Sequence, residues 1–215
     1  MNRKNIMILS GVFAIVIFAI SSFAWLQSSP SNQSMQPKVA ATLLERDYSP
    51  SFGPADAKVT IVEFFDPACE ACRAFYPVVK EILEKKPQDV RVVLRYTTFH
   101  KGSDQVVRIL EASRLQNLFK PVLEAILTRQ PEWAIHGQPN IDKAWQIAAS
   151  VGLNLSRAKI DIQDPKFTAL LKQEALDVQS AGVKKTPTFF VNGKSLPSFG
   201  AQQLFDLVMR EVKAD

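Results

Sequence analysis

Two cysteines, Cys69 and Cys72, stand three positions apart where a predicted strand meets a predicted helix. The strand is Val59–Phe65 (VTIVEFF), a β-branched and aromatic run. The helix is Ala71–Lys86, whose apolar residues recur at helical spacing until Pro87 ends it. At this separation the two sulfurs can be joined only across one tight turn. The chain has two cysteines in all, which excludes a disulfide-stapled miniprotein and a four-cysteine zinc site.

The predicted helix start indicates what the pair can do. Unpaired backbone N–H groups and the helix dipole stabilise a thiolate at Cys69, whereas Cys72 lies one turn inside and is expected to be more enclosed. A thiolate at Cys69 can attack a disulfide, and Cys72 can then resolve the mixed disulfide. Two other interpretations stay open: a pair of thiolate ligands for Cu(I), and a structural disulfide that closes a very short loop.

The folded part of the chain is predicted to be an α/β domain. A second strand, Val90–Tyr96, follows the first strand and its helix, and this order predicts a parallel βαβ unit. A third strand at Thr188–Asn192, a short fourth strand at Lys194–Phe199 and a final amphipathic helix at Ala201–Lys213 form a ββα half. Helical patterns separate the two halves, and they cover Asp104–Arg129, Ile141–Val151 and Pro165–Ser180.

The N-terminal region is typical of a targeting signal or a membrane anchor. Arg3 and Lys4 precede Ile6–Leu26, a run without a charged residue that is long enough to cross a bilayer as a helix. Residues 1–26 are therefore predicted to be a signal-anchor that leaves the rest of the chain exported. The alternative is a signal peptide cleaved near Ala24. Residues 27–47, rich in Ser, Gln and Pro at their start, are predicted to be a flexible linker.

Charge and composition argue against nucleic acid as a partner. The net charge is +5, and Arg3 and Lys4 supply two of these charges ahead of the apolar run. The remaining excess is small and scattered, unlike the clustered basic patch of a nucleic-acid surface. No glycine-rich phosphate loop occurs in the sequence.

Two segments together resemble a known active site. VEFFDPACEAC at 62–72 and KTPTFFVNGK at 185–194 resemble the two halves of a thioredoxin-superfamily site, and the helical block between them is similar to that of the DsbA-like branch. The resemblance covers about residue 48 to the C-terminus. It implies a thioredoxin-like fold over 48–215, a central mixed sheet with a helical insertion at about 101–182 between the βαβ and ββα halves.

The resemblance also implies roles for particular residues. Thr186 and Pro187 match the family's cis-proline, whose backbone faces the cysteines and pairs with a substrate strand. Glu63 matches a buried acid near the second cysteine. Strand alternation places it with Ile61 and Phe65, so we expect a raised pKa and a part in moving the Cys72 proton. From the residues alone, Pro187 is a strand-start proline.

The dipeptide between the cysteines departs from the family pattern. Strongly oxidising members carry Pro-His there, and this chain has Glu70 and Ala71. A carboxylate beside Cys69 opposes its thiolate by like-charge repulsion, which predicts a less oxidising disulfide. Oxidase, isomerase and reductase activities therefore all stay open.

The favoured function is an exported thiol:disulfide oxidoreductase that acts on protein or peptide substrates. It uses the Cys69–Cys72 pair itself, with no dissociable cofactor and no metal. The resemblance implies a membrane partner of DsbB or DsbD type that resets the pair. The location is the periplasm or cell exterior, with residues 6–26 in the inner membrane. The alternatives are a copper-handling protein that uses the pair as a Cu(I) clamp, and a peptide-holding module whose cysteines are incidental.

Three other residues are predicted to be structural. His100 and His136 lie at predicted loop ends far from Cys69 in sequence, and surface or structural roles are expected for both. Trp133 belongs to the helical block and is expected to pack in the core.

Overall fold

The structure is a computed structural model that describes residues 41–135 and 137–214. All of them lie in the second of two units into which the chain divides, the one that begins at Pro37. The strands are β1 (Ser51–Phe52), β2 (Val59–Phe65), β3 (Val90–Tyr96), β4 (Thr188–Val191) and β5 (Lys194–Ser195). The helices are α2 (Ala41–Leu44), α3 (Glu70–Lys85), α4 (Ser103–Arg114), α5 (Phe119–Thr128), α6 (Gln130–Trp133), α7 (Ile141–Ser150), α8 (Leu155–Asp161), α9 (Pro165–Ser180) and α10 (Ala201–Lys213).

The five strands form one mixed sheet in the order β1-β3-β2-β4-β5. Strands β2 and β3 run parallel, with Val59 opposite Val90 and Phe65 opposite Tyr96, and α3 connects them. Strand β4 pairs antiparallel with β2 on its other side. Both central strands are buried along nearly their whole length, which explains their continuous runs of Val, Ile, Leu and Phe.

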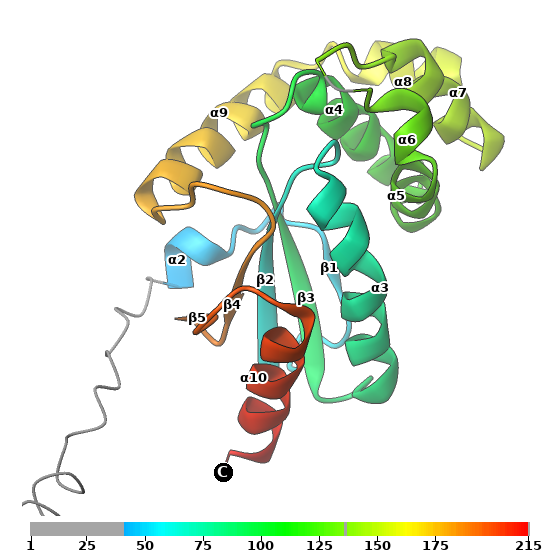
Figure 1. The fold of residues 1–215 in the computed structure, drawn as a ribbon. Helices are drawn as coiled ribbons and strands as arrows, with labels where there is room; N and C mark the ends of the chain where they lie inside the picture. Colours follow the sequence, from blue (N-terminus) through cyan, green and yellow to red (C-terminus); the bar gives the residue numbers. More distant parts are fainter. Residues whose placement is uncertain (1–40, 136, 215) are drawn as a thin grey trace, which may run out of the picture. The chain divides into compact units, whose positions relative to one another are not determined.

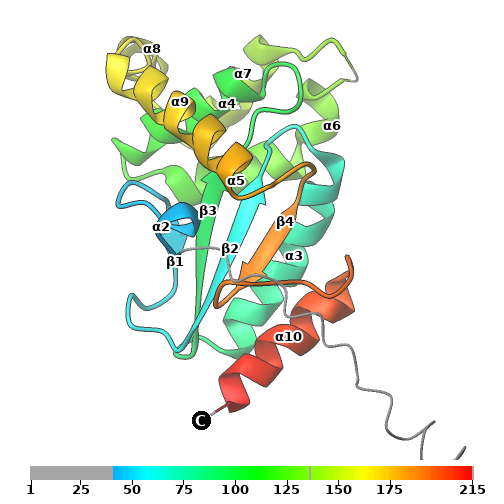
Figure 2. The ribbon, with the colours of Figure 1, turned by 90° about the vertical axis from the view of Figure 1, so that its left-hand side faces the viewer.

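Helices cover both faces of the sheet. Helices α3 and α10 pack on one face, where Ile61 and Phe65 join Ile82 and Leu204 in the main core. Figure 2 shows α2 and α9 in front of the opposite face, where Phe64 belongs to a smaller cluster. Phe189 and Phe190 of β4 alternate between these two clusters, as strand geometry requires.

Helices α4 to α9 form the insertion between the βαβ and ββα halves, and all of them except α9 lie beyond the carboxyl end of β3 (Figure 1). This confirms the predicted fold class. The stretch 104–129 was expected to be helical throughout, but the chain breaks between α4 and α5, where Asn117 has a φ of 56°. Helix α8 was not predicted, and the fourth strand is shorter than expected because only Lys194 and Ser195 pair with β4.

Residues 41–47, expected to belong to the linker, pack on the domain instead. Helix α2 has only four residues, too few to persist in isolation. The side chain of Leu44 is buried in the smaller cluster, and the Leu43 carbonyl accepts a hydrogen bond of 2.6 Å from Arg95 Nη1. Long-range contacts therefore hold this segment on the domain, and no local sequence pattern predicts that it is ordered.

A buried network of charges lies between the sheet and α9. The Arg95 side chain is 0% exposed, and its Nη2 and Nε donate to Asp177 (2.6 Å) and Glu174 (3.1 Å). Arg46 donates to the other oxygen of Asp177 at 2.6 Å. Burial alone would raise the pKa of Asp177, but the hydrogen bonds from Arg46 and Arg95 outweigh it and hold that pKa at about 2.

The predicted anchor or signal peptide, 1–26, lies outside the described residues, as does most of the predicted linker. Within the described ranges, no helix combines the length and the apolar character that crossing a bilayer requires.

Candidate functional site

Cys69 is the N-cap of α3, and Cys72 lies in the first turn of that helix. Both thiols are free and buried, with 6% of Cys69 and 1% of Cys72 exposed. The Cys69 backbone is extended (φ −76°, ψ 120°), as an N-cap requires, so its side chain lies among the unpaired N–H groups of the first turn. The predicted placement of the pair is therefore found in the structure.

Hydrogen bonds make Cys69 acidic. The Cys72 thiol is the strongest contributor, and with the Thr186 side chain and the backbone N–H groups of Ala71 and Cys72 it outweighs the opposing effect of burial. Together they lower the pKa of Cys69 to about 5. When protonated, Cys69 Sγ donates to the Thr186 carbonyl at 3.4 Å.

Cys72 has the opposite environment. Burial is the largest effect and raises the pKa of its thiol far above the ordinary value, and its hydrogen bond to Cys69 and the charge of Glu63 raise it further. The Asp66 backbone N–H donates weakly to Cys72 Sγ at 3.5 Å. The two sulfurs are thus divided into a nucleophile that is ionised at neutral pH and a protonated partner one turn away.

Alkylation of the reduced protein tests this division. We expect the rate at Cys69 to rise with pH through a midpoint near 5, because only the thiolate reacts. Cys72 is expected to stay unmodified over the same range. Iodoacetamide labelling followed by peptide mass spectrometry measures both rates. A midpoint near that of free cysteine, about 8.5, would contradict the assignment.

The segment before β4 faces the cysteine pair. The peptide bond between Thr186 and Pro187 is cis, as the resemblance implied. Pro187 is buried and Thr186 partly exposed, and Thr186 contacts Cys69 through its carbonyl. The structure therefore brings Thr186 and Pro187 to Cys69 from more than a hundred residues away in sequence.

Glu63 is buried beneath the pair. Only 2% of the residue is exposed, so the carboxyl does not reach water at the edge of the strand. Burial, followed by the negative charge of Cys69, raises the pKa of Glu63 to about 8. The carboxyl lines a small cavity of about 90 Å³ together with Tyr76 and Lys80 of α3. This position agrees with strand alternation and with the predicted rise in pKa.

Sequence analysis missed two residues that support the site. Gln130 is 1% exposed, and its Nε2 donates to the carbonyls of Pro67 (2.8 Å) and Cys69 (3.0 Å). Its Oε1 accepts from Arg73 Nε at 3.1 Å, so the helical insertion clamps the active-site turn. No motif marks Gln130, because its partners are two backbone carbonyls and one side chain that are all distant in sequence.

The other missed residue is Asp66, whose carboxylate joins two loops. It is fully buried and accepts hydrogen bonds from the backbone N–H groups of Ala68 (2.9 Å), Phe99 (2.8 Å) and His100 (3.1 Å) and from the Ser103 hydroxyl. These bonds tie the turn after β2 to the loop after β3. Because the carboxyl ends of parallel strands share one edge of a sheet, the order of elements carried a signal for this contact.

His100 lies in the same cavity as Cys69, although sequence distance had argued against any link between them. The cavity has a volume of about 470 Å³. Its charged or reactive lining residues are Cys69, Glu70, His100 and Lys101, and its large apolar ones are Phe99 and Ile135. Trp133, by contrast, is 0% exposed and packs in the core, as expected.

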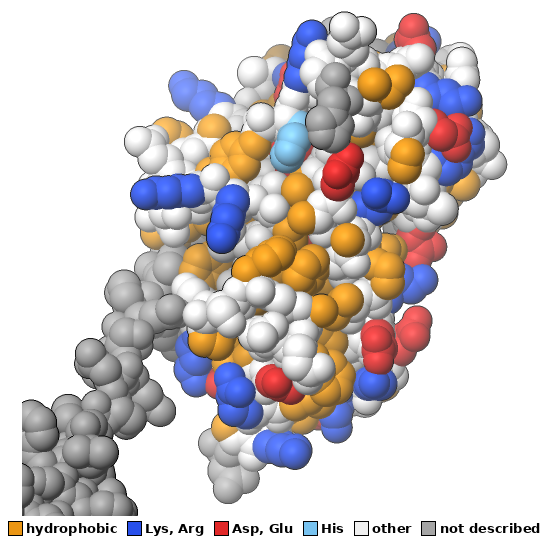
Figure 3. All heavy atoms as spheres, viewed as in Figure 1, with side chains coloured by type: hydrophobic (Ala, Val, Ile, Leu, Met, Phe, Trp, Pro, Cys, Tyr) orange, Lys and Arg blue, Asp and Glu red, His pale blue; other side chains and the backbone are white. Residues whose placement is uncertain are grey.

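Half-exposed hydrophobic side chains lie at the cavity of Cys69 and on α3. Phe99 and Ile135 are about half exposed at the cavity, and the half-exposed Phe199 packs on Phe75 of α3, with ring centroids 4.8 Å apart. Figure 3 shows a band of hydrophobic side chains below the histidine drawn in pale blue. A face of this kind suits an unfolded polypeptide better than a small polar molecule.

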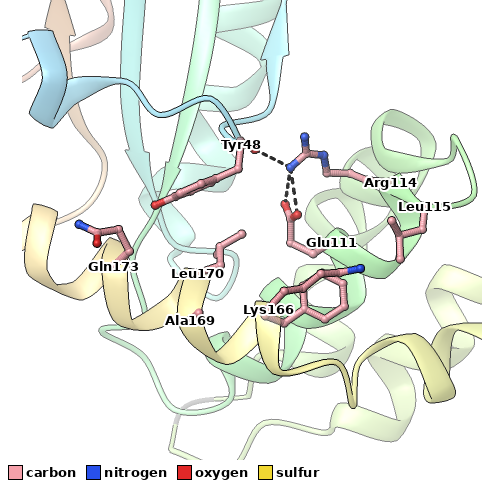
Figure 4. A pocket seen from close by; sticks show the side chains of 9 residues that line it. Tyr48, Glu111, Arg114, Leu115, Lys166, Ala169, Leu170 and Gln173 are labelled. Carbon is pink, nitrogen blue, oxygen red and sulfur yellow. Dashed lines mark hydrogen bonds and ion pairs between the residues drawn. The ribbon is translucent and has the colours of Figure 1, made fainter.

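A larger cavity of about 650 Å³ lies between α4 and α9 (Figure 4). Its lining contains no cysteine. Arg114 donates to Glu111 at 2.9 Å and to the Tyr48 carbonyl at 2.6 Å, so the main charges there compensate each other. The cysteine pair is therefore not part of this cavity. Within the described ranges, no three His, Cys, Asp or Glu side chains are arranged to hold a metal ion.

The sequence profile of the family described as Thioredoxin matches residues 45–206. A thioredoxin-like oxidoreductase from Silicibacter pomeroyi DSS-3 has a similar crystal structure, with a TM-score of 0.69 and 31% identity over 80% of this chain and 97% of the other. Disulfide bond formation protein D of Bacillus subtilis is 26% identical over 186 residues, which are 76% of this chain and 77% of that protein.

A further relative is much longer than this chain. The Na(+)/H(+) antiporter NhaA of Herminiimonas arsenicoxydans is 29% identical over 192 residues, which cover 86% of this chain and 30% of the antiporter. The chain therefore spans less than a third of the length of that relative.

Proposed function

Because this chain belongs to the thioredoxin family, we propose that it is a thiol:disulfide oxidoreductase of the DsbA-like type that exchanges disulfides with protein substrates through Cys69 and Cys72. The observation that carries the proposal is the division of the pair into an acidic thiol at a helix N-cap and a protonated thiol one turn away. A structural disulfide would not require this difference.

The steps follow from the protonation states. In the reducing direction, Cys69 Sγ attacks a substrate disulfide and one substrate sulfur leaves with the bonding electron pair. Cys72 then loses its proton and attacks Cys69 Sγ, which forms the Cys69–Cys72 disulfide and releases the second substrate sulfur. In the oxidising direction the same steps run in reverse. We propose that Glu63 exchanges this proton with Cys72, because its pKa of about 8 lets it give or take a proton near neutral pH.

The segment at Thr186 and Pro187 supplies the place for substrate. Its backbone lies against Cys69, so we propose that an extended substrate strand whose sulfur meets Cys69 pairs with this segment. The exposed hydrophobic side chains around the pair, among them Phe99, support an unfolded polypeptide as the substrate.

Glu70 and Ala71 are proposed to tune the potential. Glu70 opens α3 beside Cys69, where its negative charge opposes the thiolate and makes the disulfide less oxidising. We further propose that the domain acts in the periplasm or at the cell exterior, where disulfides persist, tethered by residues 6–26 and reset by a membrane partner of DsbB or DsbD type.

Replacing Cys72 with alanine tests the function in cells. We expect the Cys72→Ala variant to accumulate mixed disulfides between Cys69 and other proteins, because the resolving thiol is missing. Affinity purification under non-reducing conditions followed by mass spectrometry identifies the trapped proteins. The matched control is the variant in which Cys69 is also replaced by alanine, and it is expected to trap none. Tight stoichiometric copper binding with no mixed disulfides would favour the Cu(I) clamp instead.

A further inference from the structure

The strongest unassigned feature is an imidazole held at the mouth of the active-site cavity by a buried carboxylate. His100 Nδ1 lies 3.0 Å from Asp66 Oδ2, and Asp66 is fully buried whereas the His100 side chain is 47% exposed. The His100 backbone N–H also donates to Asp66 Oδ2, so both the loop and the ring are fixed. Such a carboxylate sets the tautomer of a histidine by accepting from Nδ1–H, which leaves Nε2 as the atom that exchanges protons.

The surroundings of His100 contain one nucleophile and few competing charges. Among the described residues, the titratable and charged groups that face it are Asp66, Cys69, Glu70 and Lys101. Asp66 is the one of these groups that contacts the imidazole ring. The cavity that a substrate disulfide must enter to meet Cys69 is lined by Glu70 and Lys101 as well as by Cys69 itself.

Cys69 itself does not require His100 as a base. Its thiolate is stabilised chiefly by the Cys72 thiol, the Thr186 side chain and backbone N–H groups. The sulfur that still needs a proton is the one that leaves the substrate, because an ordinary cysteine thiolate is a poor leaving group at neutral pH. His100 and Lys101 both line this cavity, and His100 is the one whose ring is held in place by a buried carboxylate, so its imidazole is positioned to supply that proton.

We propose that His100 is a catalytic residue that gives its Nε2 proton to the leaving substrate sulfur, with Asp66 as its positioning residue. In this step a bond forms between Cys69 Sγ and one substrate sulfur, and the substrate disulfide breaks. The electron pair of that bond goes to the leaving sulfur, which takes the proton from His100. The neutral imidazole takes a proton from a substrate thiol when exchange runs the other way. This inference rests on the proposed exchange function.

Two substrates with different leaving groups separate this role from a structural one. We would measure single-turnover reduction of an alkyl disulfide peptide and of an aromatic disulfide whose thiol is acidic, with wild type, His100→Ala and His100→Gln. With the alkyl disulfide near pH 6, we expect both variants to be roughly tenfold to a hundredfold slower than wild type. With the aromatic disulfide we expect equal rates, because its thiolate leaves without a proton. The difference is expected to vanish as pH rises above the range in which imidazoles titrate.

The outcomes distinguish a failure of the proposed exchange function from a failure of the role of His100. If wild type reduces neither substrate, the proposed exchange function fails. If wild type reduces both and the variants match it on the alkyl disulfide, the role of His100 fails while the function stands. Equal slowing on both substrates would show that His100 acts on Cys69 or on the fold, which also overturns the proposal. Thermal unfolding of each variant checks the fold, and the exposure of His100 predicts little change.

Discussion

Replacing Arg95 with alanine is expected to lower the free energy of unfolding by about 3 to 5 kcal/mol. The substitution leaves Glu174 without its ion-pair partner and Asp177 with only Arg46, and both carboxylates are nearly inaccessible to water. It also removes the donor to the Leu43 carbonyl, so α2 loses its hydrogen bond to the sheet and keeps only the packing of Leu44. A loss of this size is a large part of the total stability of an ordinary domain. Urea unfolding monitored by circular dichroism measures it.

Lys85 provides the matched control for Arg95. Lys85 pairs with Glu81 on the exposed face of α3, and both side chains are more than half exposed. We expect Lys85→Ala to change the free energy of unfolding by less than about 1 kcal/mol. Similar losses for the two substitutions would show that the buried network contributes no more than a surface ion pair.

Replacing Glu63 with leucine is expected to stabilise the reduced protein at pH 7. The folded protein keeps the Glu63 proton up to a pKa of about 8, whereas an unfolded chain releases it above about 4.3. Between these values the folded state binds the extra proton, so stability falls as pH rises, and the cost of the buried carboxyl at pH 7 is roughly 3 kcal/mol. Below pH 4 both states are protonated and this cost disappears.

The pH dependence separates this effect from packing. We expect the gain from Glu63→Leu in urea unfolding to be larger at pH 7 than at pH 4 by roughly 3 kcal/mol, because any packing change contributes equally at both values. A gain that is independent of pH would mean that Glu63 is already ionised in the folded protein at pH 7.

The same carboxyl is expected to matter for rate. Glu63→Gln keeps the shape of the side chain but removes its proton exchange, so resolution of the mixed disulfide by Cys72 is expected to slow, by roughly tenfold to a hundredfold. Single-turnover kinetics across pH give this rate. An unchanged pH profile would remove Glu63 from the mechanism. If replacing Glu63 raises the stability of the protein and slows its reaction, the buried acid is present for chemistry and not for folding.

Local sequence patterns predict part of this structure. The run of β-branched residues over 59–65, the helical spacing after Cys72 and the strand at 90–96 each carry their structure within a few residues, and the structure has these elements at nearly the predicted bounds. The cysteine spacing and strand alternation likewise placed Cys69 at a helix start and Glu63 on the core face, because both depend only on local geometry.

What the tertiary structure alone decided depends on contacts between distant segments. Helix α2 is held by Arg95, the active-site turn is clamped by Gln130, and His100 reaches the cavity of Cys69 through Asp66. Each of these contacts joins a side chain to a backbone or carboxylate group that lies far away along the chain, and a hydrogen bond of this kind leaves no periodic pattern in the sequence. Local propensity therefore determined the elements and the nucleophile, and the packing of the insertion against the sheet determined which groups surround it.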